Sequence, residues 1–394
     1  MPEASQLFRV GLVLQTGQAH MRGVSRGVFR FLRSNPHWRI QGAGQYPLLQ
    51  WDDLSAWEGD GLIAIPNSHA QLDALLEKQV PIVNAGSRFR EPQMTNVACD
   101  SEAIGRVAAS HLLNCGLKHF LFVGELGWEN EVRRYTAFSN FVAAAGCKCE
   151  LLSLPMNEGL APDGSARYSP DMSIISKGLS RVAKPVGVCA PNSALARFIV
   201  EEAVRCGLNV PDQVAAVGVN DDPLLCESTN PHLSAVVQPS ERIGLESAKQ
   251  LDALMSGTSQ QYQDILLPPV GIVRRRSTDM LAIDDANVRA GVRFIREHSH
   301  DPIDMVDVAR AAGVSRRSLE TKFQREIGRT PAAELRRVRI ETAKRLLAET
   351  ADPITSVVFA AGFNSRQAFS NLFRRETGLT PSEFRKQFLL ETLA

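Results

Sequence analysis

A nine-residue phrase occurs twice near the end of this 394-residue chain. Residues 323–331 read FQREIGRTP, and residues 373–381 read FRRETGLTP. Upstream, each copy has an apolar helical segment that ends in Ala-Ala-Gly, at residues 311–313 and 360–362. A helix, a short glycine turn and a second, polar-faced helix form a helix-turn-helix. A single copy is equally consistent with any helical hairpin, but two copies with matched landmarks favour two helix-turn-helix units.

The second helix of each predicted unit carries recognisable end signals. A polar residue that can cap the helix precedes it, Ser315 in the first copy and Asn364 or Ser365 in the second. Gly328 and Gly378 follow as typical helix stops. The sequence therefore predicts where each second helix begins and ends.

One further predicted helix joins the two units. Residues 332–349 have helical spacing and span roughly 27 Å at ~1.5 Å per residue. Successive major-groove faces of DNA repeat every ~34 Å, so this helix can hold both units near one duplex, with some tilt or DNA bending.

The charge balance differs between the two parts of the chain. Residues 281–394 carry 19 Lys and Arg against 15 Asp and Glu, whereas the first 280 residues carry 25 against 28. The repeat is interpreted as a domain that contacts DNA at two places.

The rest of the chain alternates short apolar runs with segments of helical spacing. Continuous apolar strands that alternate with helices predict an α/β fold with parallel sheets covered on both faces. Such sheets bind ligands at the carboxyl ends of their strands. The main runs lie at residues 10–14, 61–66, 80–86, 119–124, 185–191 and 214–222, and TNVAC at 95–99 and LSAVV at 233–237 are further predicted strands.

These patterns predict an α/β domain at residues 1–276, a linker at 277–285 and an all-α domain at 286–394. The seven cysteines form no CxxC pair, and the eight histidines lack metal-ligand spacing, so we expect free thiols, no metal and no cofactor. Without a signal peptide or a ~20-residue apolar run, the chain is expected to be soluble and cytoplasmic, with no membrane partner. No GxSxG, HExxH or P-loop occurs, which argues against an enzyme and predicts no catalytic residues.

From about residue 284 onward, the chain resembles the DNA-binding domain of AraC/XylS-family transcription regulators. The paired units and their GxTP endings carry this resemblance. It implies double-stranded DNA as a partner, with base contacts from the early part of each second helix. Arg and Gln suit bidentate contacts with guanine and adenine. The residues implied in DNA binding are Arg316, Arg317, Glu320, Thr321, Ser365, Arg366, Gln367, Ser370 and Asn371.

The first 275 residues resemble the sugar sensors of LacI-type regulators, which are related to periplasmic sugar-binding proteins. The resemblance extends through LPPVGIVRRRSTD at residues 267–279. LacI-type repressors carry their DNA-binding domain first, whereas here it comes last. The resemblance implies a two-lobed periplasmic-binding-protein-like sensor with parallel sheets, which closes on xylose or a related monosaccharide. It also favours an activator of a sugar-utilisation operon, with RNA polymerase as a partner. We expect a homodimer, because pairing two double-headed domains multiplies DNA affinity.

Polar side chains that follow the predicted strands are candidates for ligand binding. In the LacI-type pattern, an Arg three residues before a small and an aromatic residue contacts the sugar, and RYTAF places Arg134 there. A planar guanidinium can bind two vicinal hydroxyls. Asp222, before Pro223, is interpreted as the start of a helix or turn. The predicted ligand-binding residues are Gln15, Thr16, Asp100, Trp128, Arg134, Asn192, Asn220, Asp221 and Gln238.

Two positions depart from the LacI-type pattern. Asn220 stands where that family usually has Asp, and Asn192-Ser193 stands where it has Asn-Asp. Both changes remove charge but keep hydrogen-bonding capacity, so the sequence does not name the sugar. The alternatives are a sugar-binding carrier and a sugar-active enzyme, neither of which binds DNA. The added helical domain and the missing catalytic motifs count against them.

Overall fold

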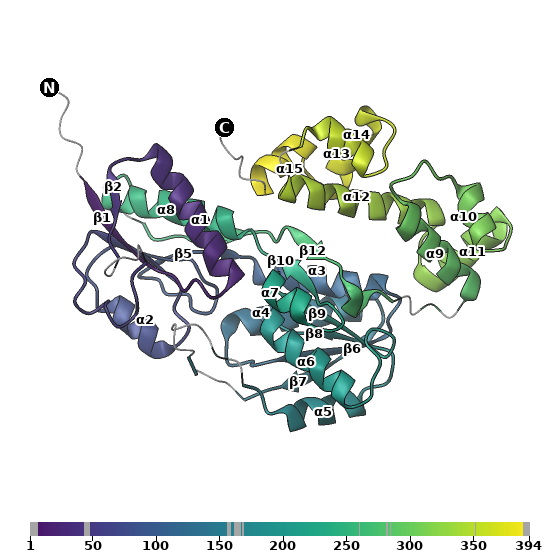
Figure 1. Cartoon of the computed structure of the whole chain (residues 1–394), viewed down its shortest axis with the longest axis horizontal. Coiled ribbons are helices and arrows are strands. Elements are labelled where there is room, and N and C mark those ends of the chain that lie inside the picture. Colours follow the sequence, from purple (N-terminus) through teal and green to yellow (C-terminus); the bar gives the residue numbers. More distant parts are fainter. Residues whose placement is uncertain are drawn as a thin grey trace.

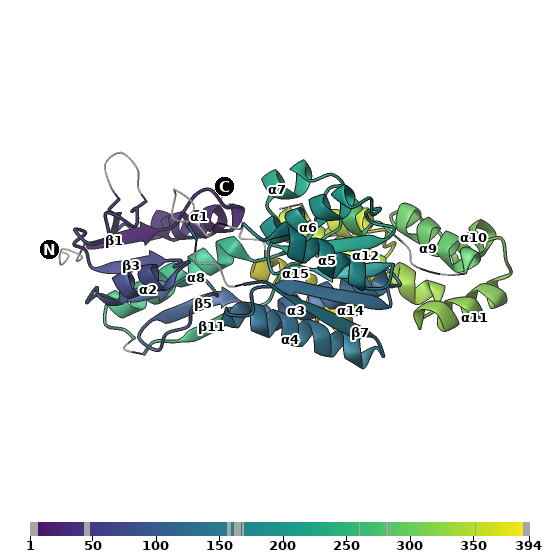
Figure 2. The ribbon, with the colours of Figure 1, turned by 90° about the horizontal axis from the view of Figure 1, so that it is seen from below.

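The computed structural model describes residues 7–42, 48–155, 159–160, 167, 169–259, 261–280, 283, 285–350 and 352–388. Two α/β lobes lie side by side, and a helical half extends along one side of them (Figures 1 and 2). The parallel-sheet sensor and the all-α domain predicted from the sequence are confirmed. The predicted linker includes residues 281, 282 and 284, and the predicted DNA-binding domain includes residues 389–394, all of which lie outside the described residues.

The N-terminal lobe is built on a six-stranded, fully parallel sheet of order β11-β5-β4-β3-β1-β2. Its central strands are buried on both faces, which matches their continuous apolar runs. Helices α1, α2 and α8 cover the sheet. The elements are β1 (Phe8–Val13), α1 (Ala19–Ser34), β2 (Trp38–Ile40), β3 (Gly61–Ala64), α2 (His69–Leu76), β4 (Ile82–Asn84), β5 (Thr95–Cys99), α8 (Ser240–Met255) and β11 (Asp264–Leu267).

The C-terminal lobe has a second six-stranded sheet, of order β12-β10-β9-β8-β6-β7, in which β12 alone runs antiparallel. The chain crosses between the lobes after β5, after β10 and after β11, so these three segments form the hinge. The elements are α3 (Ser101–Asn114), β6 (His119–Gly124), α4 (Glu129–Ala144), β7 (Lys148–Ser153), α5 (Met172–Arg181), β8 (Val186–Cys189), α6 (Ser193–Arg205), β9 (Val214–Val219), α7 (Pro223–Ser228), β10 (Ser234–Val237), β12 (Gly271–Val273) and the 3-10 turn η1 (Arg276–Thr278).

Helices α1 and α8 approach closely because glycines lie where they cross. A Cβ on Gly27 would lie 2.0 Å from the carbonyl oxygen of Glu241, and a Cβ on Gly244 would lie 1.9 Å from that of Val24. Any side chain at either position would push the helices apart. This close crossing places the first turn of α1 beside the hinge segment that leads from β10 into α8.

The helical half contains seven helices in the part of the chain that the structure describes. They are α9 (Ala286–His298), α10 (Met305–Ala311), α11 (Arg316–Ile327), α12 (Pro331–Glu349), α13 (Ile354–Ala360), α14 (Arg366–Thr377) and α15 (Pro381–Phe388). Helices α10 and α11 form one helix-turn-helix, α13 and α14 form the other, and α12 joins them, as predicted. Each unit has its own core, and the repeated Phe323 and Phe373 are each fully buried in one of them.

The predicted helix ends are also confirmed. Ser315 caps α11 by accepting from the backbone N–H of Ser318, and Ser365, rather than Asn364, caps α14 by accepting from that of Ala368. Gly328 and Gly378 end these helices in the left-handed conformation, at φ 69° and 76°, which glycine adopts without steric cost. The repeated Thr-Pro then begins the next helix, since Thr330 is the N-cap of α12 and Pro331 is its first residue.

Candidate functional site

A cavity of about 160 Å³ lies between the two lobes, at the carboxyl ends of their strands. Both lobes contribute to its wall. From the N-terminal lobe come the first turn of α1 and the segments after β3 and β4. From the C-terminal lobe come α4 and the segments after β8 and β9, and Gln238 of the hinge also faces it. This cavity is the candidate ligand cleft.

Four of the nine predicted ligand-binding residues line the cleft: Arg134, Asn192, Asn220 and Gln238. The side chain of Arg134 is 5% exposed, and its Nη1 donates to the carbonyl oxygen of Pro191 at 2.5 Å. The side chain of Asn192 caps α6, and its Nδ2 has no partner among the described residues. Both groups are therefore held in place with donors beside the cavity.

Asn220 and Gln238 form a pair at the hinge. Asn220 has φ 69°, which makes it the one non-glycine residue with positive φ in the described part of the chain. Strained conformations of this kind gather at ligand sites, and asparagine tolerates this one better than most residues. Nε2 of Gln238 donates to Oδ1 of Asn220, and Ser193 donates to the Asn220 carbonyl oxygen at 2.5 Å. The pair joins the cleft to the crossover that leads into α8.

The other five predicted residues lie outside this cavity. Gln15 is buried, its Oε1 has no hydrogen-bond partner among the described residues, and Thr16 is exposed. Asp100 caps α3 and lines an adjacent cavity of about 140 Å³, which shares Gly86, Ser87 and Asn130 with the cleft. Asp221 points elsewhere and pairs with Arg275 at 2.6 Å.

Trp128 lies in an unexpected place. It follows β6 in the C-terminal lobe, yet its ring is buried in a hydrophobic cluster of the N-terminal lobe, beside His69 and Phe89. The guanidinium of Arg88 lies 4.3 Å from the centre of the Trp128 ring, and Arg88 lines the cleft. The sequence predicted that Trp128 binds the ligand, whereas in the structure its ring lies against Arg88.

Several cleft residues were missed from the sequence. They include His20, Asn67, Ser87, Arg88, Asn130 and Glu131. Ser87 and Arg88 are the first two residues after the predicted apolar run at 80–86, so the position of this run was a signal for both. Asp222 caps α7, as its position before Pro223 indicated, and it also lines the cleft.

Burial shifts two titratable groups in the cleft. Burial, helped by the positive charge of Arg134, lowers the pKa of His20 to about 4. Burial raises the pKa of Glu131 to about 7, against the opposing effects of a hydrogen bond from the Glu125 backbone N–H and of Arg134. His20 is therefore neutral at neutral pH and offers one donor and one acceptor. Its Nδ1 lies 2.8 Å from the hydroxyl of Ser240.

The predicted DNA-contacting residues lie at the beginnings of α11 and α14. Seven of them are exposed, namely Arg316, Arg317, Thr321, Ser365, Arg366, Gln367 and Asn371, and Glu320 and Ser370 are partly buried. Arg316 pairs with Glu320 at 2.9 Å, and Gln367 donates to Asn371 at 3.2 Å. The two helices thus present guanidinium and amide groups that can contact base edges.

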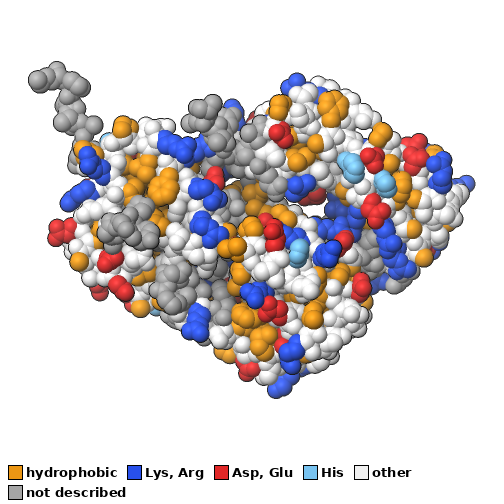
Figure 3. Space-filling model, in the orientation of Figure 1, with side chains coloured by type: hydrophobic (Ala, Val, Ile, Leu, Met, Phe, Trp, Pro, Cys, Tyr) orange, Lys and Arg blue, Asp and Glu red, His pale blue; other side chains and the backbone are white. Residues whose placement is uncertain are grey.

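Arginines also gather where the two halves of the molecule meet. A hollow of about 660 Å³ between the linker and α9 is lined by Arg274, Arg275, Arg276, Arg289, Arg293 and Arg296, with Asp212, Asp279 and Glu297. Figure 3 shows Lys and Arg side chains gathered in this region, right of centre. Arg274 pairs with Asp279, and Arg296 donates to the carbonyl oxygen of Asn114 at 3.2 Å, which joins α9 to the sensor.

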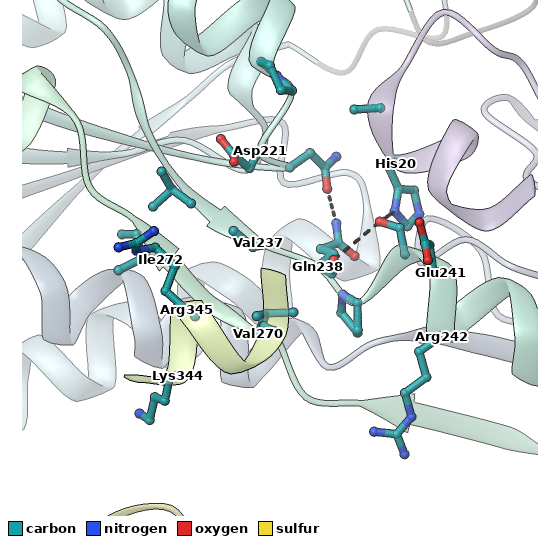
Figure 4. A pocket seen from close by; sticks show the side chains of 18 of the residues that line it. His20, Asp221, Val237, Gln238, Glu241, Arg242, Val270, Ile272, Lys344 and Arg345 are labelled. Carbon is teal, nitrogen blue, oxygen red and sulfur yellow. Dashed lines mark hydrogen bonds between the residues drawn. The ribbon is translucent and has the colours of Figure 1, made fainter. Parts of the chain in front are cut away.

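A second hollow, of about 610 Å³, lies between the sensor and α12 (Figure 4). Its walls come from the first turn of α1, the hinge, β12 and the end of α12, where Arg345 lies close to Ile272. Asn220 and Gln238 line this hollow as well as the cleft. The hinge therefore lies between the cleft and the helix that joins the two helix-turn-helix units.

Two features are absent from the described residues. No three His, Cys, Asp or Glu side chains come together there as metal ligands would. None of the helices seen there is both long enough and apolar enough to cross a membrane.

Comparisons with known proteins match both halves of the chain. A periplasmic binding protein-like domain matches residues 109–278, and a helix-turn-helix domain matches residues 308–387. The chain joins a periplasmic binding protein-like sensor to an AraC-type DNA-binding domain. The order predicted from the sequence, with the AraC-type domain last, is confirmed.

Relatives with the same order span almost the whole chain. The xylose operon regulatory protein of Escherichia coli K12 is 29% identical over 96% of both chains. That of Haemophilus influenzae is 25% identical over 96% of this chain and 98% of its own. A solved structure of a xylose-binding transcription activator has a TM-score of 0.59 at 27% identity and covers 97% of this chain and 98% of that one. The AraC-type domain and its sensor thus occur together in these relatives.

Proposed function

We propose that this protein is a transcription regulator that binds a monosaccharide between its lobes and DNA through its two recognition helices. The observation that carries the proposal is that one chain contains both a ligand cleft and two helix-turn-helix units. One hinge borders both the cleft and α12, the helix that joins these units. A ligand that prefers the closed lobes shifts the sensor towards closure. Closure then changes the hinge surface that faces the DNA-binding half, which couples the two sites.

The size and lining of the cleft support a single sugar ring as the ligand. Its volume of about 160 Å³ is roughly ten times the ~10–15 Å³ that a single water molecule needs, so it has room for a small molecule. Arg134, Asn192 and Gln238 supply donors and acceptors suited to vicinal hydroxyls. Two relatives are named as regulators of a xylose operon, and a third is described as xylose-binding, so we propose xylose or a related monosaccharide as the ligand. Asn220 and Ser193 stand where LacI-type regulators usually have aspartates. This difference allows a ligand other than xylose.

The DNA-binding part of the proposal depends on α11, α12 and α14. Helix α12 has 19 residues and is therefore roughly 28 Å long. This length is close to the ~34 Å repeat of the major groove, so both recognition helices can contact one duplex. We assign base contacts to the exposed residues of α11 and α14 named above.

The relatives support the remaining features of the proposed function. One of them is described as a transcription activator, so we propose that this protein activates an operon for sugar use, with RNA polymerase as a partner. We also propose a homodimer, since two double-headed domains bind DNA far more tightly than one. Because the proposed role is DNA binding, we also propose a cytoplasmic location and no catalytic activity.

A thermal-shift screen against pentoses, hexoses and deoxysugars, followed by calorimetry, tests the ligand. A sugar that raises the melting temperature and binds one site per chain supports the proposal. Selection from random duplexes tests DNA binding with the same protein. A protein that binds sugar but no duplex is a carrier, and one that converts the sugar is an enzyme, so either result would refute the proposal.

A further inference from the structure

Two residues of the C-terminal lobe hold ligand-facing parts of the N-terminal lobe. We propose that Trp128 and Asp222 are positioning residues that complete the cleft only when the lobes are closed. Trp128 acts through Arg88, and Asp222 acts through the first turn of α1, which contains His20. The inference rests on the proposed function, because it concerns the regulation of the same cleft.

Helix α1 lacks a cap from its own lobe. Its N-cap residue, Gln18, makes no side-chain capping bond, and no acidic residue lies in its first turn. The first N–H groups of a helix need acceptors, and its N-terminus favours a negative charge. Asp222 meets both needs from the opposite lobe. Its Oδ2 accepts from the backbone N–H of Ala19 at 2.8 Å, and its Oδ1 lies 3.7 Å from the guanidinium of Arg22.

Asp222 also caps α7 in its own lobe, because its Oδ1 accepts from the backbone N–H of Leu224 at 3.1 Å. One buried carboxylate therefore caps two helices, because Oδ2 accepts from Ala19 of α1 and Oδ1 accepts from Leu224 of α7. An aspartate can accept on both oxygens, whereas an asparagine can accept on only one. When the lobes separate, the bond to Leu224 stays within one lobe, but the bond to Ala19 is lost.

Trp128 makes the second connection between the lobes. The turn that carries it follows β6 of the C-terminal lobe, while its ring is 2% exposed inside a cluster that contains Leu49, Leu54 and Leu72 of the N-terminal lobe. Its Nε1 donates to Glu125 at 3.1 Å, which fixes the ring from its own lobe. Opening the lobes withdraws this ring from the cluster and removes the aromatic face beneath Arg88.

The contacts of Asp222 with Ala19 and of Trp128 with Arg88 both hold residues that line the cleft. Neither contact requires a bound ligand. Two further polar contacts cross the cleft, from Arg134 and Asn130 to the hydroxyl of Ser87, and they are longer, at 3.4 Å each. The contacts of Asp222 and Trp128 thus favour closure before ligand binds, and they lower the cost of assembling the site around it.

Four variants of the full chain and one control test the inference. Asp222→Asn keeps the side-chain size and the local cap of α7 but cannot cap both helices. Ala19→Pro removes the backbone N–H donor at the first position of α1. Proline fits a helix at this position, and the extended backbone of Gln18 is compatible with a proline after it. Trp128→Ala empties the cluster, and Trp128→Phe restores an aromatic face. The matched control is Asp171→Asn, since exposed Asp171 caps only its own helix, through one oxygen.

Small-angle X-ray scattering of the ligand-free chain measures lobe separation. We expect a larger radius of gyration for Asp222→Asn, Ala19→Pro and Trp128→Ala than for the wild type, Asp171→Asn and Trp128→Phe. Asp222→Asn combined with Ala19→Pro should expand the molecule no more than either change alone. Wild-type dimensions in both the Asp222 and the Ala19 variants, or an equal expansion in the Asp171 control, would overturn the inference.

Calorimetry with D-xylose then measures the effect on ligand binding. We expect Asp222→Asn to weaken binding by about 2- to 30-fold, the effect of losing a helix cap. Unchanged affinity in Asp222→Asn would overturn its positioning role. If D-xylose does not bind the wild type, the proposed ligand fails, while the scattering result still decides whether these residues close the lobes.

Discussion

At the scale of single residues, Arg134 is the strongest candidate for ligand contact. Arg134→Ala should weaken sugar binding about 10- to 150-fold, since a charged donor to hydroxyls contributes ~1.5–3 kcal/mol. The side chain is buried and donates to Pro191, so we also expect a lower melting temperature.

Calorimetry and melting curves of Arg134→Ala and Arg133→Ala provide the comparison. Arg133 is the matched control, because it is exposed on the same helix and pairs with Glu129. Loss of affinity in the Arg134 variant alone would support the contact. Equal affinities in both variants would remove Arg134 from the site.

Glu334 supports the start of α12 and makes stability depend on pH. Its side chain is fully buried between Arg329 and Arg337, at 2.6 and 2.7 Å. Burial raises its pKa, but the hydrogen bond and charge of Arg337 and the charge of Arg329 outweigh burial and lower the pKa from 4.5 to about 2. The ion pairs therefore stabilise the fold above pH 4.5, and this stabilisation is lost as pH falls towards 2.

Glu334→Gln tests this account of α12. At pH 7 the variant should lose about 3 kcal/mol of unfolding free energy, the lower end for a broken buried pair, since both arginines are partly exposed. The difference from the wild type should shrink between pH 5 and pH 2. Urea unfolding followed by circular dichroism measures it, with Glu341→Gln as a more exposed control. A difference that stays constant with pH would contradict the assignment.

At the scale of elements, the repeat made the helical half predictable. Cap residues, glycine stops and Thr-Pro starts are local signals, and the structure confirms them at Ser315, Gly328 and Thr330. The sheets were predictable where their strands are buried on both faces. Strands β2, β7, β11 and β12 were missed because they are short or partly exposed and lack a continuous apolar run; β7, for example, reads KCELLS and is largely exposed.

The cleft was less predictable than the fold for a similar reason. Its residues come from segments far apart in the chain, and what each side chain faces depends on how the lobes pack. Trp128 shows this most clearly, because no local signal indicates that its ring enters the opposite lobe. Asp222 has a clear local role as a cap, which hid its second role across the cleft.

The recognition helix α14 carries its own prediction. Arg366→Ala and Gln367→Ala should each relax sequence preference at one or two base pairs, at a cost of ~1–3 kcal/mol of discrimination. Lys386→Ala, an exposed change on α15, should at most weaken binding evenly across sequences. Selection from random duplexes, followed by sequencing, measures the preference. Identical preferences in the wild type and both α14 variants would contradict the assignment of α14 to the groove.

At the scale of the whole molecule, the two halves have separate cores. The clusters around Phe323 and Phe373 use no residue of the sensor. A fragment of residues 284–394 should therefore fold and bind duplex DNA without the sensor. Its affinity should fall steeply with salt, because neutralising phosphates releases counterions. Fluorescence anisotropy at several salt concentrations measures this, and a helical fragment with no affinity at low salt would contradict the DNA-binding role.

The central claim is that ligand binding between the lobes changes DNA binding by the helical half. The direct measurement is the affinity of the full chain for a selected duplex, with and without a saturating sugar found by the thermal-shift screen. The account predicts a change of roughly 5- to 150-fold, the usual range of coupling between two sites. At sugar concentrations that saturate only the wild type, Arg134→Ala should show a much smaller change. Equal DNA affinity with and without bound sugar in the wild type would contradict the account.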